Sequence, residues 1–151
     1  MLGRLARWLR VLGFDTAADA SLHDRDLVRW ADAEGRILLT RDRHLLRELR
    51  PRLALEIRHD APLDQLRDVL TALGSPPPPG LFTRCTLCNG PLLRLAPGQD
   101  AAHLPQGLRD DPGPVWQCRD CGHVYWQGSH VRRMRTTLAR ALPQLVPPDV
   151  P

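Results

Sequence analysis

The sequence contains no lysine, so all 21 basic residues of the 151-residue chain are arginine. Each positive charge is therefore a planar guanidinium, which can hold a phosphate through two parallel hydrogen bonds. Against 17 acidic residues the formal net charge is only +4. This small excess excludes a polybasic arm, so any contact with nucleic acid must come from local clusters of arginine.

Long apolar runs are also missing. No stretch approaches the roughly 18 consecutive apolar residues that a membrane-spanning helix needs. The N-terminal segment does not have the layout of a signal peptide, because Arg4, Arg7 and Arg10 interrupt its apolar residues. We therefore expect a cytoplasmic protein with no membrane contact. Nothing in the sequence indicates an oligomeric state.

Cysteine is absent until position 85, and all four cysteines follow the segment GSPPPPG. Four consecutive prolines cannot continue a helix or a central strand, and they form a stiff, extended spacer. We therefore expect a core at 1–75, a proline-rich linker at 76–80 and a cysteine-containing module at 81–142. The proline-rich tail at 143–151 is expected to be disordered.

The first part of the chain has the apolar patterning of alternating helices and strands. The patterning predicts helices at 2–12, 25–34, 43–49 and 62–73, strands at 36–40 and 53–57, and a weaker strand at 14–18. This alternation indicates an α/β fold, in which a largely parallel sheet is flanked by helices. Ligand sites in such sheets lie beyond the carboxyl ends of the strands.

Three acidic residues could gather at that edge of the sheet. Asp24 begins a predicted helix, Asp42 directly follows the strand at 36–40, and Asp60 follows the strand at 53–57. Two or three carboxylates could hold Mg²⁺ or Mn²⁺, and such an ion assists hydrolysis of a phosphodiester bond. Each residue also has an ordinary explanation. Asp24 and Asp42 could cap helices, and Asp60 could be a turn residue.

Two arginine-rich stretches are candidates for contact with phosphate. Arg4, Arg7 and Arg10 are spaced by three residues, so they share one polar face of the first helix. The segment VYWQGSHVRRMR contains Tyr125 and Trp126, which could pack inside the module or stack on a base. Ser129 could cap a final helix. Solvated helix faces explain both basic stretches equally simply.

The cysteines form two C-x2-C motifs, which comprise Cys85, Cys88, Cys118 and Cys121. Two residues between cysteines let both sulfurs reach one tetrahedral ion, and this pattern is typical of a structural zinc ribbon. The 29 residues between Cys88 and Cys118 exceed the commonest spacing, and residues 96–114 are the expected insert. Disulfides or redox-active pairs are the alternatives, but neither suits a cytosolic chain without a thioredoxin-like pattern.

These motifs together resemble the Mut-seven C-terminal RNase domain family. The resemblance rests on MLGRLARWLRVLGFDT, DRDLVRWADAEGRILLTRD, CTLCNGPL and CRDCGHVYWQGSH, in this order over about residues 1–134. It implies a PIN-like (Rossmann-like) nuclease core followed by a zinc ribbon. It further implies cleavage of RNA that depends on Mg²⁺ or Mn²⁺. In this resemblance Asp24 and Asp42 match the family's acidic metal ligands, and the four cysteines match its zinc ligands. The resemblance assigns no role to Asp60.

The chain departs from the family at its start. In the family, a short strand that ends in an acidic residue precedes the segment beginning MLG, whereas this chain begins at that methionine. The core is therefore expected to lack its first strand and one acidic ligand. We expect the true start of the protein to lie upstream. A natively short and inactive protein is the alternative.

The leading hypothesis is a metal-dependent ribonuclease whose structural zinc ribbon assists RNA binding. The expected catalytic residues, and ligands of Mg²⁺ or Mn²⁺, are Asp24 and Asp42. The expected contacts to RNA are Arg4, Arg7, Arg10, Arg41, Ser129 and His130. The rival is a non-catalytic module, which binds RNA or a protein and has lost an acidic ligand. A toxin that is paired with an antitoxin is a third possibility.

Overall fold

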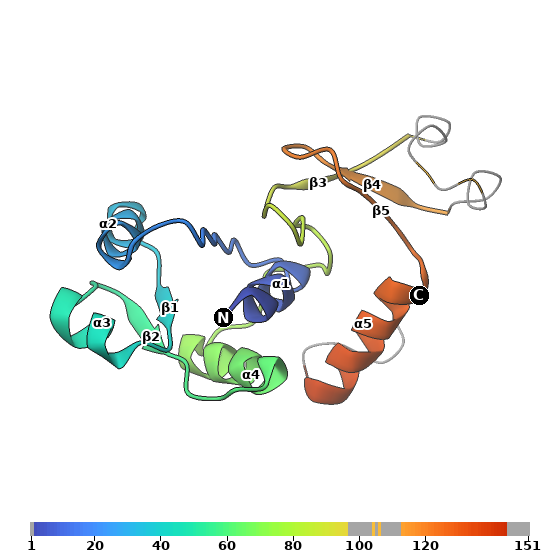
Figure 1. Ribbon diagram of the computed structural model, residues 1–151. Coiled ribbons are helices and arrows are strands. Elements are labelled where there is room, and N and C mark those ends of the chain that lie inside the picture. The colour runs from blue at the N-terminus through green and yellow to red at the C-terminus, as the bar shows by residue number, and fades with distance from the viewer. Residues whose placement is uncertain (1, 97–103, 105, 107–112, 145–151) are drawn as a thin grey trace. The chain divides into compact units, whose positions relative to one another are not determined.

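The computed structural model of the chain describes residues 2–96, 104, 106 and 113–144. Its elements, in chain order, are α1 (Gly3–Val11), α2 (Asp24–Glu34), β1 (Leu38–Thr40), α3 (Arg43–Leu49), β2 (Ala54–Glu56), α4 (Pro62–Leu73), β3 (Leu92–Arg94), β4 (Val115–Cys118), β5 (Val124–Trp126) and α5 (Ser129–Ala141) (Figure 1).

The residues group into two compact units. The first contains the residues up to Trp8 together with Ala17–Ser75, and the second contains Leu9–Thr16 and the chain from Pro76 onwards. The boundary between the two units after Ser75 coincides with the start of the proline-rich segment. Leu9–Thr16, which the sequence analysis assigned to the core at 1–75, groups with the cysteine-containing unit instead. Helix α1 therefore contributes residues to both units.

The first unit has a small parallel sheet with helices beside it, so the α/β class is confirmed. Strands β1 and β2 pair in parallel, with Leu38 opposite Ala54 and Thr40 opposite Glu56. Helix α3 connects them in sequence, and α2 and α4 flank this β1–α3–β2 segment along the chain. The parallel pairing brings the carboxyl ends of both strands to one edge.

The helix boundaries in this unit follow local signals that are visible in the sequence. Helix α4 begins with Pro62 and ends before Gly74, which has a φ of 62°. Helix α2 ends before Gly35, whose φ is 64°. Both glycines lie in the left-handed region that favours glycine at the end of a helix. The predictions of 43–49 and 62–73 as helices are confirmed at both ends.

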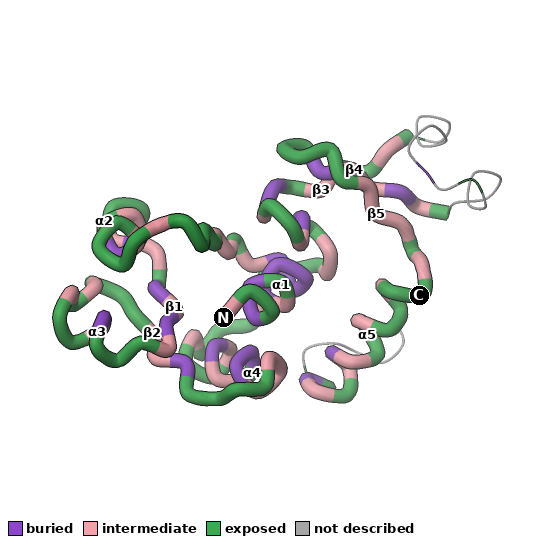
Figure 2. Tube along the Cα trace, in the orientation of Figure 1, coloured by how far each residue is buried: buried purple, intermediate pink, exposed green. Residues whose placement is uncertain are grey.

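The core of the first unit lies between α2, β1 and α3. It consists of Val28 and Ala31 from α2, Leu38 from β1 and Leu45 from α3. Figure 2 shows buried segments on β1 and on α4, where Leu66 and other residues are enclosed. Burial of these side chains is the main force that holds the short strands in place.

The second unit contains a three-stranded antiparallel sheet in the order β3-β4-β5. Leu92 pairs with Cys118, and Trp116 pairs with both Arg94 and Tyr125. The turn between β4 and β5 contains Gly122 at a φ of 74°. This antiparallel meander with cysteines at its turns is the local framework that a zinc ribbon requires.

The segment at 14–18 forms no strand, so that prediction was wrong. Phe14 donates its backbone N–H to the carbonyl of Leu9 at 3.0 Å, which closes the end of α1. Thr16 donates its backbone N–H to Oδ1 of Asn89 at 2.9 Å. The side chain of Asn89, 73 residues away in sequence, therefore accepts the hydrogen bond that a neighbouring strand would accept if this segment were a strand.

Arg10 is buried in the second unit, at 6% exposure, although the sequence pattern places it on a polar helix face. Steps of three residues rotate by about −60° around a helix, so Arg10 lies about 120° from Arg4. Its Nε donates to the carbonyl of Thr16 at 2.9 Å. Its Nη1 donates to the carbonyls of Thr86 and Leu87 at 3.0 and 2.9 Å. The expected arginine stripe is thereby reduced to the exposed pair Arg4 and Arg7.

The end of the chain differs from expectation in one detail. Gly128 occupies the N-cap position of α5, so Ser129 is the first helical residue and its side chain does not cap the helix. The expected disordered tail lies largely outside the described residues, as does most of the expected insert at 96–114.

Among the helices in the described part of the chain, none combines the length and the apolar character that crossing a bilayer requires.

Replacing Arg10 with alanine should destabilise the second unit. The change removes three hydrogen bonds from a buried cation to backbone carbonyls. We expect the free energy of unfolding to fall by about 2 kcal/mol or more, measured by urea denaturation. Arg7→Ala is the matched control, because Arg7 is exposed on the same helix and its loss should change stability by less than about 0.5 kcal/mol. Equal losses in the two variants would contradict the structural role of Arg10.

Candidate functional site

The structure brings together all four cysteines that the spacing singled out. Cys85 and Cys88 lie in the turn before β3, Cys118 ends β4, and Cys121 lies in the turn between β4 and β5. Their four sulfur atoms lie within 4.8 Å of one another. Cys85 and Cys118 are buried, whereas Cys88 and Cys121 are exposed.

The sulfur separations suit one tetrahedral ion. Cys85 Sγ lies 3.7 Å from Cys121 Sγ, and Cys88 Sγ lies 3.4 Å from Cys118 Sγ. Zinc–sulfur bonds of about 2.3 Å give a tetrahedron whose edges are about 3.8 Å long. All four cysteines are free thiols, and each of these two contacts joins one C-x2-C motif to the other. The donor set therefore fits zinc rather than two disulfides.

The backbone of the first motif is shaped around the sulfur atoms. Gly90 donates its N–H to Cys88 Sγ at 3.4 Å. A Cβ atom at Gly90 would lie 2.9 Å from Cys118 Sγ, so only glycine fits here without displacing a ligand. The preceding residue, Asn89, has a φ of 73°, which completes the tight turn.

The ionisation of the thiols also favours a bound cation. Desolvation opposes ionisation of Cys85, but the backbone amides of Cys88 and Leu87 and the Tyr125 hydroxyl lower the pKa of the Cys85 thiol to about 6. Desolvation and the neighbouring thiols raise the pKa of Cys88 to about 12. One thiolate forms readily, and further ionisation at such close range requires a positive charge between the sulfurs.

Tyr125 belongs to this cluster, and the sequence analysis missed that role. Its hydroxyl lies 3.1 Å from Cys85 Sγ and accepts a hydrogen bond from the Thr86 backbone N–H at 3.1 Å. Burial and the nearby Cys85 sulfur raise the pKa of Tyr125 to about 12, so it stays a neutral donor. The only sequence signal was its place four residues after Cys121.

Asp42 lies at the carboxyl end of β1, as expected, and it caps α3. Its Oδ1 accepts hydrogen bonds from the backbone N–H groups of His44 and Leu45 at 2.7 and 3.0 Å. The Asp42 N–H in turn donates to Thr40 Oγ1 at 3.0 Å. These two hydrogen bonds hold the pKa of the Asp42 carboxyl below its usual value, and the bond from the Leu45 N–H has the larger effect. Oδ2 takes part in neither bond, so capping and metal binding are compatible roles.

The other two candidate acids lie at different local positions. Asp24 is the first residue of α2, is exposed, and follows His23 at the N-cap. Asp60 is exposed in the segment after β2, where it forms an ion pair with Arg41. Arg41, an expected RNA contact, therefore joins the end of β1 to the segment after β2.

The three acids do not form a compact ligand group. Apart from the four cysteines, the described residues contain no group of three or more His, Cys, Asp or Glu side chains whose ligand atoms lie within 4.8 Å of one another. Two carboxylates, with water and a substrate phosphate, still meet the usual requirements of Mg²⁺. A further carboxylate, Glu56, lies opposite Thr40 at the same end of the sheet, where Arg43 Nε lies 2.7 Å from its Oε1.

The remaining candidates for contact with RNA are exposed on two elements. Arg4 and Arg7 are exposed on α1, and Ser129 and His130 are exposed in the first turn of α5. Arg10 instead donates hydrogen bonds to the backbone carbonyls of Thr16, Thr86 and Leu87.

The comparisons with known proteins gave one match. A family model described as Mut7-C RNAse domain matches residues 1–138. No curated protein and no solved structure matches the chain. The matched range contains all four cysteines, Asp24 and Asp42.

Removal of metal should selectively disrupt the second unit. We expect the purified chain to contain one zinc ion, and chelation should abolish the ordered signal of the β3-β4-β5 sheet in circular dichroism. Cys118→Ser should lower the zinc content well below one per chain. His123→Ala should retain one zinc, because His123 contributes no ligand atom to the cluster. Full zinc content in Cys118→Ser would contradict this assignment.

Asp42 should make stability depend on pH in the acidic range. Its pKa is lowered in the folded chain, so its stabilising effect is present above the ordinary carboxyl value and is lost as the pH falls through the folded value. We expect the melting temperature of the wild type to fall more steeply between about pH 5 and pH 3 than that of Asp42→Asn. Parallel curves for the two proteins would show that the capping carboxylate has no such effect.

Proposed function

The chain belongs to the Mut7-C RNAse domain family, since the family model matches residues 1–138, and from this membership we propose that it is a metal-dependent ribonuclease. The proposed reaction is hydrolysis of phosphodiester bonds in RNA, with a structural zinc ribbon that helps to bind the substrate. The family match carries the proposal, and the position of Asp42 at the carboxyl end of a parallel strand supports it. We expect the protein to act in the cytoplasm.

Asp24 and Asp42 are the proposed catalytic carboxylates. A bound Mg²⁺ or Mn²⁺ ion would polarise a phosphoryl oxygen and help to deprotonate the attacking water. The amides of His44 and Leu45 orient the Asp42 carboxylate and keep it ionised at neutral pH. Thr40 fixes the turn that carries Asp42, because its hydroxyl accepts the Asp42 N–H. The chain thus holds one charged oxygen ligand in a defined orientation before substrate arrives.

The four cysteines are proposed to hold Zn²⁺ in a structural role. Four thiolates complete the tetrahedral coordination of zinc, which leaves no position open for water or substrate. The ion would hold the turn before β3 against the β4–β5 turn, which come from distant parts of the chain. Zinc therefore shapes the second unit and takes no part in the chemical step.

RNA is the proposed substrate and binding partner. Arg4 and Arg7 are exposed guanidiniums that can contact phosphates. Arg41 directly precedes Asp42 and pairs with Asp60, and we propose it as a contact to a phosphate near Asp42. Ser129 and His130 offer a hydroxyl and an imidazole at the exposed start of α5. These residues supply binding that does not depend on base sequence.

A non-catalytic binding module is the second candidate function. It is favoured by the observation that, within the described residues, neither Asp24 nor Asp42 belongs to a compact group of three or more potential ligand side chains. Binding of a divalent ion by two carboxylates alone is weak. In that case the chain would bind RNA, or a protein, with an affinity that is insensitive to substitution of either acid.

Asp42→Asn should abolish cleavage of RNA without unfolding the chain. Asparagine keeps an oxygen that can cap α3, so the variant should stay folded at neutral pH although it loses the effect of the charge. The loss of the charged ligand should reduce the rate of cleavage in Mn²⁺ by about 100-fold or more. The measurement is cleavage of labelled single-stranded RNA by the zinc-loaded chain.

Asp26→Asn is the matched control for this experiment. Asp26 is an exposed acid in the first turn of α2, where it pairs with Arg29, and it has no proposed role in cleavage. Its substitution should leave the rate unchanged. Equal activity of Asp42→Asn and the wild type, or no cleavage by the wild type, would refute the ribonuclease proposal.

A further inference from the structure

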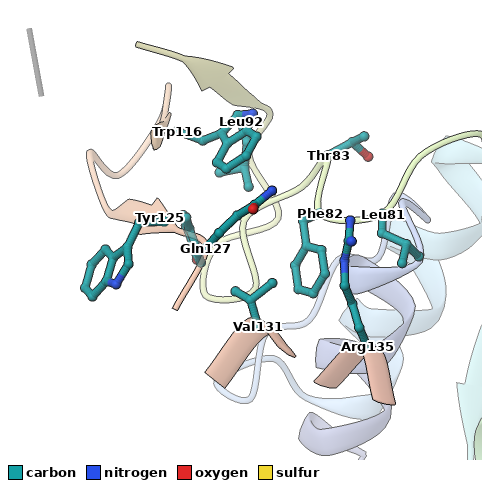
Figure 3. A pocket seen from close by; sticks show the side chains of 10 residues that line it. Leu81, Phe82, Thr83, Leu92, Trp116, Tyr125, Gln127, Val131 and Arg135 are labelled. Carbon is teal, nitrogen blue, oxygen red and sulfur yellow. The ribbon is translucent and has the colours of Figure 1, made fainter. Parts of the chain in front are cut away.

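The second unit contains a pocket that the proposed catalytic residues do not use. Its volume is about 200 Å³. Three parts of the unit line it: the segment at 81–83, the sheet and helix α5. Figure 3 shows side chains from all three parts around the same hollow.

The sheet contributes aromatic rings to the pocket. Trp116 and Tyr125 are directly opposite each other in the antiparallel pairing of β4 with β5. Residues paired in this way present their side chains on the same face of the sheet. Both are half-buried, so their rings are neither enclosed in a core nor fully in solvent. The face therefore offers a flat surface on which another ring can stack.

Phe82 adds a third ring, and its backbone is strained. Its φ is 57°, in the left-handed region that bulky side chains rarely adopt. The conformation is held by a hydrogen bond from the Phe82 N–H to the carbonyl of Val11 at 2.9 Å. Such strain is retained where the surrounding structure enforces it, commonly at a functional site. Here it places the phenyl ring in the wall of the pocket.

The polar groups of the pocket suit a nucleotide. Gln127 lines it with an amide, which can both donate and accept a hydrogen bond at the edge of a base. Val131 and Arg135, one helical turn apart, line it from α5. This helix carries four arginines and no acidic residue. The positive charge of this helix complements the phosphates on either side of a bound base and disfavours a basic or purely apolar peptide.

We propose that this pocket binds one unstacked base of single-stranded RNA. An apolar cavity of about 150 Å³ accepts a benzene ring, so the observed volume suffices for a ring of the size of a base. The base stacks on the aromatic wall, Gln127 contacts its edge, and the arginines of α5 contact the adjoining phosphates. This inference rests on the proposed function, because it names how the same protein would hold its RNA substrate.

Binding of two oligomers to the zinc-loaded full chain, without added Mg²⁺ or Mn²⁺, tests the proposal. One is a fluorescein-labelled uridine hexamer, and the other is a hexamer of the same length in which every nucleotide is abasic. Fluorescence anisotropy gives both dissociation constants. We expect the uridine hexamer to bind at least about fivefold more tightly, the lower end of the contribution of one base–aromatic stack.

Substitution of Phe82 assigns this preference to the pocket. Phe82→Leu retains an apolar side chain but removes the ring, and it should reduce the preference for the uridine hexamer toward onefold. Zinc content identifies a folded variant. Arg133→Ala is the matched control, because Arg133 is exposed on α5 and does not line the pocket. It should weaken binding of both oligomers equally and leave their ratio unchanged.

The possible outcomes separate this inference from the ribonuclease proposal. Equal affinity of the wild type for the two oligomers would overturn the base pocket, even if the chain cleaves RNA in Mn²⁺. A preference that survives in Phe82→Leu would overturn it too, because the base would then bind elsewhere on the chain. Conversely, a preference that Phe82→Leu removes, in a chain that cleaves no RNA, would support the pocket and refute only the catalytic role.

Discussion

The convergence of four sulfur atoms is the constraint on which the second unit depends. Four thiolates at these separations would repel one another, and a divalent cation at their centre, such as the proposed zinc ion, would offset that repulsion. The turn that carries Cys85 and Cys88 also presents backbone and side-chain groups to the end of α1. Arg10 binds the carbonyls of Thr86 and Leu87, and Thr16 binds the side chain of Asn89. These hydrogen bonds tie Arg10 and Thr16 to the turn that carries the first two cysteines.

Features that depend on local chemistry could be predicted from the sequence. Asp42 caps α3 through amides two and three residues away, and Pro62 and Gly74 mark the ends of α4. The two C-x2-C motifs could be recognised because each of these cysteine turns, or knuckles, is formed by only a few consecutive residues. Their spacing predicted one cluster, although 29 residues of sequence separate the two motifs.

Features that depend on distant partners could not be predicted in this way. Arg10 follows the same helical spacing as Arg4 and Arg7, and only its contacts with the first knuckle show that it is structural. The segment after α1 has the composition of a weak strand, but Asn89 satisfies its amide. Tyr125 has the sequence context of an ordinary packing residue, and its position beside Cys85 follows from the pairing of β4 with β5. The three acids were candidates for one site because each lies at an end of a helix or strand. That pattern does not determine the distances between their side chains.

The coordination of the metal ion tests this account most directly. X-ray absorption at the zinc edge of the purified chain reports the number, type and distance of the atoms bound to zinc. The account predicts four sulfur neighbours at about 2.3 Å and no nitrogen or oxygen neighbour. A shell containing nitrogen or oxygen at about 2.0 Å would contradict it, since an open or mixed site could not hold both turns through the four cysteines alone.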